Sequence, residues 1–337
     1  MIRGFLDSIA QSPVYANSEK DWCITLQQST CYWYEFIVNP PDCGDTKSGI
    51  GRMLNDLRSQ VEKTFEKCFI YFFASRPRVR FDTSRRPYFE FFSKKLVLHL
   101  LVGRAKKRVI LKTVVRDIQG NVVTPSVELS ERFVTIFNGA APAEMYSVHD
   151  FLQYLDFSIG ASTTIHYVGI TKNPADRPLN RKHRGITDTL YNISNEENDF
   201  FIYINLFKVT AHAKNPVSGF AFVTANSMTD EIKTDEEGAI VEGALISYFE
   251  CKSQRINRDK ERASFRRRLN SVANKNKIHS VAVHIEVEQP SEYFAFGSES
   301  VPPAHSHTFV FESVHKDLEL TKLGSKEELL SRIQPKQ

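Results

Sequence analysis

The stretch TIHYVGITKNPADRPLNRKHRG at residues 164–185 places a strand, a turn and a group of cations next to one tyrosine. Residues 165–170 alternate β-branched and aromatic side chains, as a half-buried strand does, and Gly169 interrupts them where a backbone comes close to another group. Pro178 disfavours helix at the residue before it, so a short helix is predicted to begin at Pro178 and to end before Gly185. The chain after the strand carries several cationic side chains close together in sequence, which predicts an anion-binding site. These residues are Arg177, Arg181, Lys182, His183 and Arg184.

Length and composition are those of an ordinary globular protein. The chain has 337 residues and a net charge of +4, and this length suggests two domains. No apolar run reaches the length of a membrane span, and the N-terminus lacks the apolar core of a signal peptide, so we expect a cytoplasmic protein without a membrane partner. Its five cysteines form no C-x-x-C pair, which argues against a disulfide framework and a structural zinc site.

The pattern of apolar residues predicts an α+β fold in three segments. Residues 1–145 contain strand-like runs and one amphipathic helix at 51–69, which predicts a mainly antiparallel β domain packed on that helix. Residues 146–275 form the second predicted domain, and residues 276–337 add C-terminal strands and a helix that pack on the body. The strand-like runs of the first segment are 22–26, 31–38, 68–73, 88–92, 96–102, 109–115 and 133–137. The main elements predicted after it are a helix at 147–155, strands at 165–170 and 200–210, and helices at 235–250 and 326–333.

Positive charge is concentrated between Arg76 and Arg116. This segment holds thirteen lysines and arginines against two acidic residues, a net charge of +11. Such an excess repels itself unless it faces a polyanion, and for an intracellular protein a nucleic-acid backbone is the commonest one. We therefore expect this domain to bind DNA, chiefly through Arg104, Lys106, Lys107 and Arg108. Aromatic residues are interleaved with the cations, and core packing is the favoured role for them, with base stacking as the alternative. These aromatic residues are Phe81, Tyr88, Phe89, Phe91 and Phe92.

Glu242 occupies an unusual position in the predicted helix 235–250. It falls between Ala239 and Ile246 on a partly apolar face, where an unpaired carboxylate is costly, so a metal ion or an arginine is the expected partner. The alternative is a carboxylate at the rim of an acidic stretch. A second basic segment follows this helix and can be a DNA-phosphate track or a solvated helix. Its candidate DNA-binding residues are Lys252, Arg255, Arg258 and Arg266.

The motif YVGITKNPADR resembles the second half of the GIY-YIG nuclease signature, in which Tyr-(Ile/Val)-Gly is followed by x-Thr-x-Asn and then by an arginine. The matching positions are Tyr167, Val168, Gly169, Thr171, Asn173 and Arg177. The family's next landmark is a glutamate on a helix, written E-x-x-L-I, with an asparagine further on. Glu242, Leu245 and Ile246 fit the first and Asn257 the second, so the resemblance covers about residues 155–270.

Three positions depart from the family's pattern. No Gly-Ile-Tyr lies about ten residues before Tyr167, so the family's first tyrosine is unassigned; Tyr154, the nearest upstream tyrosine, falls in the predicted helix 147–155. Pro178 follows Arg177 directly, which leaves Arg181 as an alternative catalytic arginine. His183 lies two residues later than the family's usual histidine.

The resemblance implies a small antiparallel sheet flanked by helices and a DNA endonuclease that uses Mg²⁺ or Mn²⁺. It implies that Glu242 holds the metal, that Arg177 or Arg181 stabilises charge at phosphorus, and that Asn257 braces the site. Tyr167, His183 or the unassigned tyrosine would position or deprotonate the attacking water. The implied partner is double-stranded DNA, with a homodimer as an option and restriction, defence or mobility as the setting. Two other interpretations stay open: a nuclease-like fold that binds nucleic acid without cutting it, and a scaffold that recruits an acidic protein.

Overall fold

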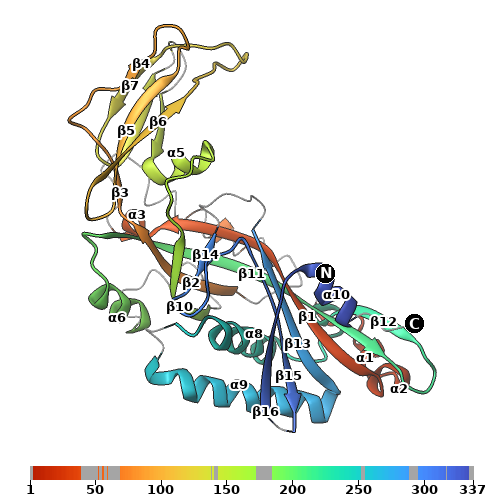
Figure 1. The fold of residues 1–337 in the computed structure, drawn as a ribbon. Coiled ribbons are helices and arrows are strands. Elements are labelled where there is room, and N and C mark those ends of the chain that lie inside the picture. Colours follow the sequence, from red (N-terminus) through yellow and green to blue (C-terminus); the bar gives the residue numbers. More distant parts are fainter. Residues whose placement is uncertain are drawn as a thin grey trace.

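The computed structural model describes residues 3–38, 69–137, 143–171, 184–251, 255–287, 295–315 and 317–333, with the single positions 52, 55, 56, 59 and 139. The predicted α+β class is confirmed, since helices and strands pack around a large curled sheet (Figure 1). None of the helices in the described part of the chain is long and apolar enough to cross a membrane.

The large sheet has nine strands in the order β14-β10-β2-β11-β1-β13-β15-β16, and β12 also pairs with β11. Neighbouring strands are antiparallel, except that β1 and β13 are parallel, as are β10 and β14. The strands are β1 (Glu19–Trp33), β2 (Phe69–Pro77), β10 (Thr163–Thr171), β11 (Asn198–Lys214), β12 (Ala221–Ala225), β13 (Ile278–Glu286), β14 (Phe296–Gly297), β15 (Ser306–Val314) and β16 (Asp317–Leu323).

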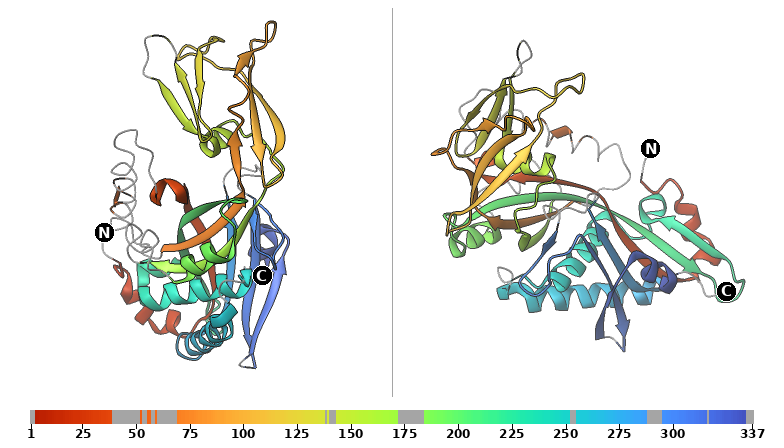
Figure 2. Two further views of the ribbon diagram at one scale, coloured as in Figure 1. Left: turned by 90° about the vertical axis from the view of Figure 1, so that its left-hand side faces the viewer. Right: turned by 45° about the horizontal axis from the view of Figure 1, so that its top comes forward.

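The described residues of 79–147 leave this sheet and form what we call the lobe, which lies at one end of the molecule in both views of Figure 2. One of its sheets has the order β3-β5-β4 with β6 beside β5, and the other has the order β7-β8-β9. The strands are β3 (Val79–Phe81), β4 (Tyr88–Phe89), β5 (Leu96–Val102), β6 (Lys107–Thr113), β7 (Ser126–Leu129), β8 (Phe133–Phe137) and β9 (Glu144–Ser147). The chain returns to the large sheet through α5 (Val148–Tyr154), whose first turn is capped by Ser147.

Helices cover both faces of the large sheet around β2. Phe72 of β2 contacts Phe249 of α8 on one face, which we call the α8 face, and α9 packs beside α8. Tyr71 and Phe73 point to the other face, which we call the tyrosine face, where Phe73 stacks on Phe200 with ring centroids 5.5 Å apart. β2 is therefore buried on both sides and its sequence is almost continuously apolar. The helices are α1 (Asp7–Gln11), α2 (Pro13–Ala16), α3 (Tyr34–Val38), α6 (Arg184–Asn192), α7 (Asn226–Thr229), α8 (Thr234–Phe249), α9 (Arg255–Asn276) and α10 (Lys326–Ile333).

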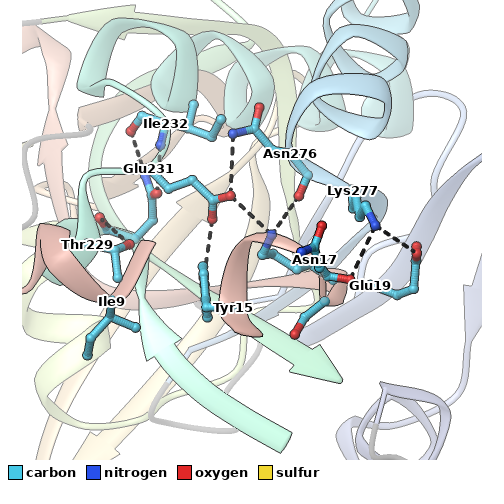
Figure 3. A network of polar contacts seen from close by, with 12 residues as sticks. Ile9, Tyr15, Asn17, Glu19, Thr229, Glu231, Ile232, Asn276 and Lys277 are labelled. Carbon is cyan, nitrogen blue, oxygen red and sulfur yellow. Dashed lines mark hydrogen bonds and ion pairs between the residues drawn. The ribbon is translucent and has the colours of Figure 1, made fainter. Parts of the chain in front are cut away.

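A buried lysine connects β1 to the residues that precede α8 and to the end of α9. Lys20 Nζ donates to the Asn276 carbonyl at 2.7 Å and lies 3.2 Å from the Glu231 carboxylate. Glu231 also accepts from the Tyr15 hydroxyl at 3.2 Å (Figure 3). Burial lowers the pKa of Lys20, and the charge of Glu231 opposes that shift. Each charged group of this network has a partner within it, so we assign the network a structural role, which is to hold β1 against the end of α9.

Several predicted elements are wrong in detail. The strand predicted at 31–38 ends at Trp33 and the chain continues as α3, because an apolar run such as this one fits either structure until packing decides. The strand predicted at 88–92 stops at Phe89, and a turn follows. The helix predicted from Pro178 lies almost wholly outside the described residues, but its predicted end before Gly185 is wrong, since Gly185 lies inside α6, where Ile186 packs into the core. Most of the helix predicted at 51–69 lies outside the described residues.

The large sheet draws strands from all three predicted segments. β1 and β2 come from 1–145, β10 and β11 from 146–275, and β13, β15 and β16 from 276–337. The lobe has sheets of its own, and the strand that precedes it and the strand that follows it, β2 and β10, are neighbours in the large sheet.

Candidate functional site

Two tyrosines from distant parts of the chain meet on the tyrosine face. Tyr71 of β2 and Tyr167 of β10 stack with ring centroids 5.8 Å apart and an interplanar angle of 28°. Their strands pair in antiparallel register, with Gly169 opposite Tyr71. Tyr71 is fully buried, while Tyr167 is half-buried. Tyr167 is therefore the ring of the pair that reaches the surface.

Gly169 makes this arrangement possible. A Cβ atom at this position would lie 2.6 Å from the Tyr71 hydroxyl oxygen and 2.7 Å from Cε1 of Tyr167. Carbon atoms of a side chain do not approach other atoms so closely, so both rings need a residue without a side chain beneath them. The close approach predicted for Gly169 is therefore present, and its partners are the two tyrosines.

Glu242 lies beside the same glycine. It comes from the middle of α8, and its Oε1 atom accepts a hydrogen bond of 2.8 Å from the backbone N–H of Ile170, the residue after Gly169. The side chain is only partly buried. A hydrogen bond from a backbone amide to a carboxylate fixes its orientation, because strand β10 is rigid. Adjacent residues of β10 thus contact the two features, with the tyrosine rings over Gly169 and the Glu242 carboxylate at the Ile170 N–H.

Close helix packing positions α9 beside this carboxylate. Gly243, next to Glu242, faces Phe265 of α9, and a Cβ atom there would lie 2.8 Å from the Phe265 side chain. The absence of a side chain lets the two helices approach. Asn257 belongs to the first turn of α9, and its side chain lies outside the described residues.

Several predicted site residues cannot be placed. Arg177, Arg181 and His183 lie outside the described residues, as does Lys252. Arg255 and Arg258 are in the first turn of α9, and only their backbone is described. Arg266 is exposed and lies 3.0 Å from Asp317 in an ion pair. The described part of the predicted phosphate track is therefore helical, and two of its arginines, Arg262 and Arg266, have acidic partners.

Tyr154 is not part of the site. It lies at the end of α5, is 72% exposed and stacks on Tyr146 of the lobe. The tyrosine that lies against Tyr167 is Tyr71, which the sequence analysis did not consider. It lies 96 positions before Tyr167 in the sequence, and a search close to the motif does not reach it.

The four cations predicted to bind DNA lie at one turn. Arg104, Lys106, Lys107 and Arg108 are exposed at the turn between β5 and β6, at the base of the lobe. Arg104 forms an ion pair of 2.9 Å with Glu197 of the main body, and Arg108 lies 3.6 Å from the buried Asp82. The turn is therefore a cationic surface, although two of its charges have acidic neighbours.

The charge excess of the segment 76–116 is smaller at the surface than its sequence suggests. Arg76 is buried and donates to Thr163 and Tyr203 at 2.6 and 2.7 Å. Arg80 is buried and bonds both carboxylate oxygens of Asp199 at 2.9 Å. The inference that every cation of the segment needs a polyanion is wrong for these two, because internal partners already satisfy them.

Asp199 is the centre of a buried polar network. It accepts from Val79 N–H and His149 Nε2–H at 2.9 Å, as well as from Arg80. Burial lowers the pKa of His149 although its bond to Asp199 opposes the shift. Burial acts to raise the pKa of Asp199, but the bond from His149 and the charge of Arg80 hold it below its ordinary value. Arg80 and Asp199 line a cleft of about 460 Å³ that also contacts Glu35 and Phe200.

The donor set near Glu242 fits a magnesium ion better than a transition metal. The described residues contain no group of three or more His, Cys, Asp or Glu side chains arranged to hold a metal. Mg²⁺ keeps several waters and needs only one or two protein carboxylates when a phosphate supplies further oxygens. Glu242 offers one oriented carboxylate at this strand edge, which is compatible with that requirement.

The aromatic residues of the lobe divide into two groups. Phe81 is buried in the core and Phe89 is half-buried against it. Tyr88 is 52% exposed, while Phe91 and Phe92 are 88% and 95% exposed. The expectation that the interleaved aromatics fill the core is therefore wrong for Phe91 and Phe92, because they fall in a turn and not in a strand.

Comparison with protein-family models, with curated proteins and with solved structures finds no match to this chain.

Proposed function

We propose that this protein is a Mg²⁺-dependent DNA endonuclease whose site includes Tyr71, Tyr167 and Glu242. The observation that carries the proposal is the convergence of these three side chains on Gly169 and Ile170. The residues lie in three separate parts of the sequence, and two of them fall on the motif positions that resemble a GIY-YIG nuclease. Convergence of motif residues at one strand edge supports a shared chemical role.

We further infer that Tyr71 takes the place of the unassigned first tyrosine. It ends the tripeptide Phe69-Ile70-Tyr71, which differs from Gly-Ile-Tyr only at its first residue. Its strand β2 lies between β10 and β11, and these three antiparallel strands are the counterpart of the expected small sheet. Residues 78–162 then form an insertion between the two tyrosine strands, and the lobe is part of that insertion.

The proposed chemistry divides among the residues of the site. Hydrolysis of a phosphodiester requires an oriented water, neutralisation of charge at phosphorus and help for the leaving oxygen. The hydroxyl group of Tyr167, the ring of the pair that reaches the surface, can contact and orient the water, and the buried Tyr71 would help to orient it through its stacking on Tyr167. Glu242, oriented by the Ile170 N–H, would hold Mg²⁺, which supplies charge neutralisation when bound. Arg177, with Arg181 as the alternative, would stabilise the charge that develops on the phosphoryl oxygens, and Asn257 would brace the site.

A plasmid-cleavage assay tests this proposal. Wild-type protein incubated with supercoiled plasmid DNA and Mg²⁺ or Mn²⁺ should give nicked and linear products, and a chelator should prevent them. The lobe's cationic turn supports DNA as the substrate, because exposed lysines and arginines bind the phosphate backbone. Plasmid that remains supercoiled in both metals, with protein shown to be folded, would contradict the proposed activity.

A further inference from the structure

Two phenylalanines project from the far tip of the lobe. Phe91 and Phe92 occupy the turn between β4 and β5 and are 88% and 95% exposed. Their rings contact each other edge to face with centroids 5.1 Å apart. The core beneath them is complete, since Leu96 and Leu98 of the next strand are fully buried. Two large apolar side chains held together in water are a mark of an interaction site.

The turn that carries them is fixed. Glu90 N–H donates to the Lys95 carbonyl at 2.9 Å, and Lys94 N–H donates to the Glu90 carbonyl at 3.0 Å. The Glu90 carboxylate binds Lys112 Nζ of β6 at 2.5 Å. A closed hairpin turn tied to the neighbouring strand presents its side chains in a defined direction. The phenylalanines therefore need little ordering when a partner binds.

Cations surround this tip. Lys94 and Lys95 are exposed in the same turn. Leu96 pairs with Thr113, so β6 ends at this same end of the sheet and the exposed Arg116 follows it. The nearby Ile118 is 98% exposed. The tip thus combines apolar side chains at its centre with positive charge around them.

We propose that Phe91 and Phe92 form a wedge that inserts between stacked bases of duplex DNA bound along the lobe. Proteins that bend DNA insert apolar side chains of this kind between base steps while nearby cations bind the phosphates. This inference rests on the DNA partner of the proposed function and adds the way in which that partner is bound.

The distribution of charge favours DNA over a membrane surface. The cations of the tip lie at one end of the β5–β6 hairpin, and Arg104, Lys106, Lys107 and Arg108 lie at the other. Seven residues of strand separate the two groups by roughly 20 Å, a distance that spans about six base pairs along one strand of DNA. A membrane surface would contact only the tip, whereas a duplex lying along the hairpin contacts both groups.

The test uses the full chain in EDTA, so that no cleavage occurs, and a DNA duplex containing 2-aminopurine, whose fluorescence rises when it is unstacked. Wild-type protein should raise the fluorescence several-fold at saturation. The double variant Phe91→Ala, Phe92→Ala should abolish the rise and weaken binding by about tenfold or more. Its salt dependence should stay unchanged, because no charge is removed.

Phe220→Ala is the matched control, because Phe220 is 64% exposed in the turn between β11 and β12, at the other end of the molecule. It should behave like wild-type protein. An undiminished fluorescence rise in the Phe91→Ala, Phe92→Ala variant would overturn the wedge. The wedge would also be overturned if that variant lost binding to phosphatidylserine vesicles but bound DNA as wild-type protein does. That result would assign the tip to a membrane. The readout needs no cleavage, so a protein that inserts its phenylalanines but does not cut supports the wedge and overturns only the proposed activity.

Discussion

Two pairs of neighbouring aromatic rings lie in opposite surroundings. Tyr71 and Tyr167 stack 5.8 Å apart on the large sheet, with Gly169 beneath them and the Glu242 carboxylate beside that glycine. Phe91 and Phe92 lie 5.1 Å apart at the tip of the lobe and contact water on most of their surface. The fold confines the tyrosine pair, and it exposes the phenylalanine pair to solvent.

This difference separates two kinds of role. Rings that stack on each other over a strand have fixed positions, which is what chemistry at a bound phosphate requires. Exposed rings on a rigid turn have apolar surface available for a partner. Substitutions at the first pair should therefore change turnover, and substitutions around the second should change DNA binding.

The largest effect is expected for Gly169→Ala. The added methyl group would displace both tyrosine rings, one of which is fully buried, so we expect a loss of about 1–3 kcal/mol in the free energy of unfolding together with loss of cleavage. Chemical denaturation and the plasmid assay measure the two effects. Gly324→Ala is the control, because its Cβ would meet only the Glu328 side chain at 3.5 Å. Wild-type stability in Gly169→Ala would contradict the packing described here.

Tyr71→Phe should reduce turnover without unfolding the protein. The ring still stacks on Tyr167, but the hydroxyl that would help to orient the water through Tyr167 is gone, and such groups contribute on the order of 10²-fold to rate. Single-turnover cleavage measures the effect. Tyr32→Phe, in the same apolar cluster, is the control. If both variants cut equally well, Tyr71 is not the first tyrosine of the motif.

Changing Arg104, Lys106, Lys107 and Arg108 to alanine should weaken DNA binding and flatten its salt dependence. Each phosphate contact contributes about 0.9 to the slope of log affinity against log salt concentration. Since Arg104 and Arg108 already have acidic neighbours, we expect the slope to fall by about two to four. Arg332→Ala, which breaks a surface ion pair with Glu312, is the control. If the slope of log affinity against log salt concentration is unchanged, DNA does not bind at the base of the lobe.

The smallest effect concerns pH. His149 has a lowered pKa in the folded protein, so the unfolded chain binds a proton more readily and stability falls as the pH drops below about 6.5. The pKa of Asp199 is also lowered, so its contribution is lost only below its ordinary value of 3.8. His149→Gln should reduce the loss of stability between pH 7 and pH 5, by less than about 2 kcal/mol. Chemical denaturation at pH 7 and pH 5 measures this loss of stability, and the exposed His315→Gln is the control. If His149→Gln loses as much stability between the two pH values as wild-type protein does, His149 is not the group responsible.

Local pattern predicted the elements that carry the site. The strands at 165–170 and 200–210 are confirmed within β10 and β11, and the helix at 235–250 is confirmed by α8, which ends one residue earlier, because each has apolar residues over a sufficient length. The close approach at Gly169 was also predictable, since a glycine inside a strand needs a reason.

The partners of those elements could not be predicted from local pattern. Tyr71 reaches Tyr167 only because β2 and β10 pair across the long insertion that contains the lobe. Strand pairing over such a distance depends on the whole fold. Phe91 and Phe92 were assigned to the core for another reason, since alternation of aromatic residues indicates a strand and does not reveal where the strand turns.

The most direct test of the central claim is single-turnover cleavage by Glu242→Gln in Mg²⁺. This substitution keeps the shape of the side chain and an oxygen that can accept from Ile170 N–H, but it removes the charge that would hold the metal. Glu236→Gln, in the first turn of the same helix, is the control. We predict that Glu242→Gln folds and binds DNA like wild-type protein and does not cut it. Cleavage by Glu242→Gln at the wild-type rate would contradict the account.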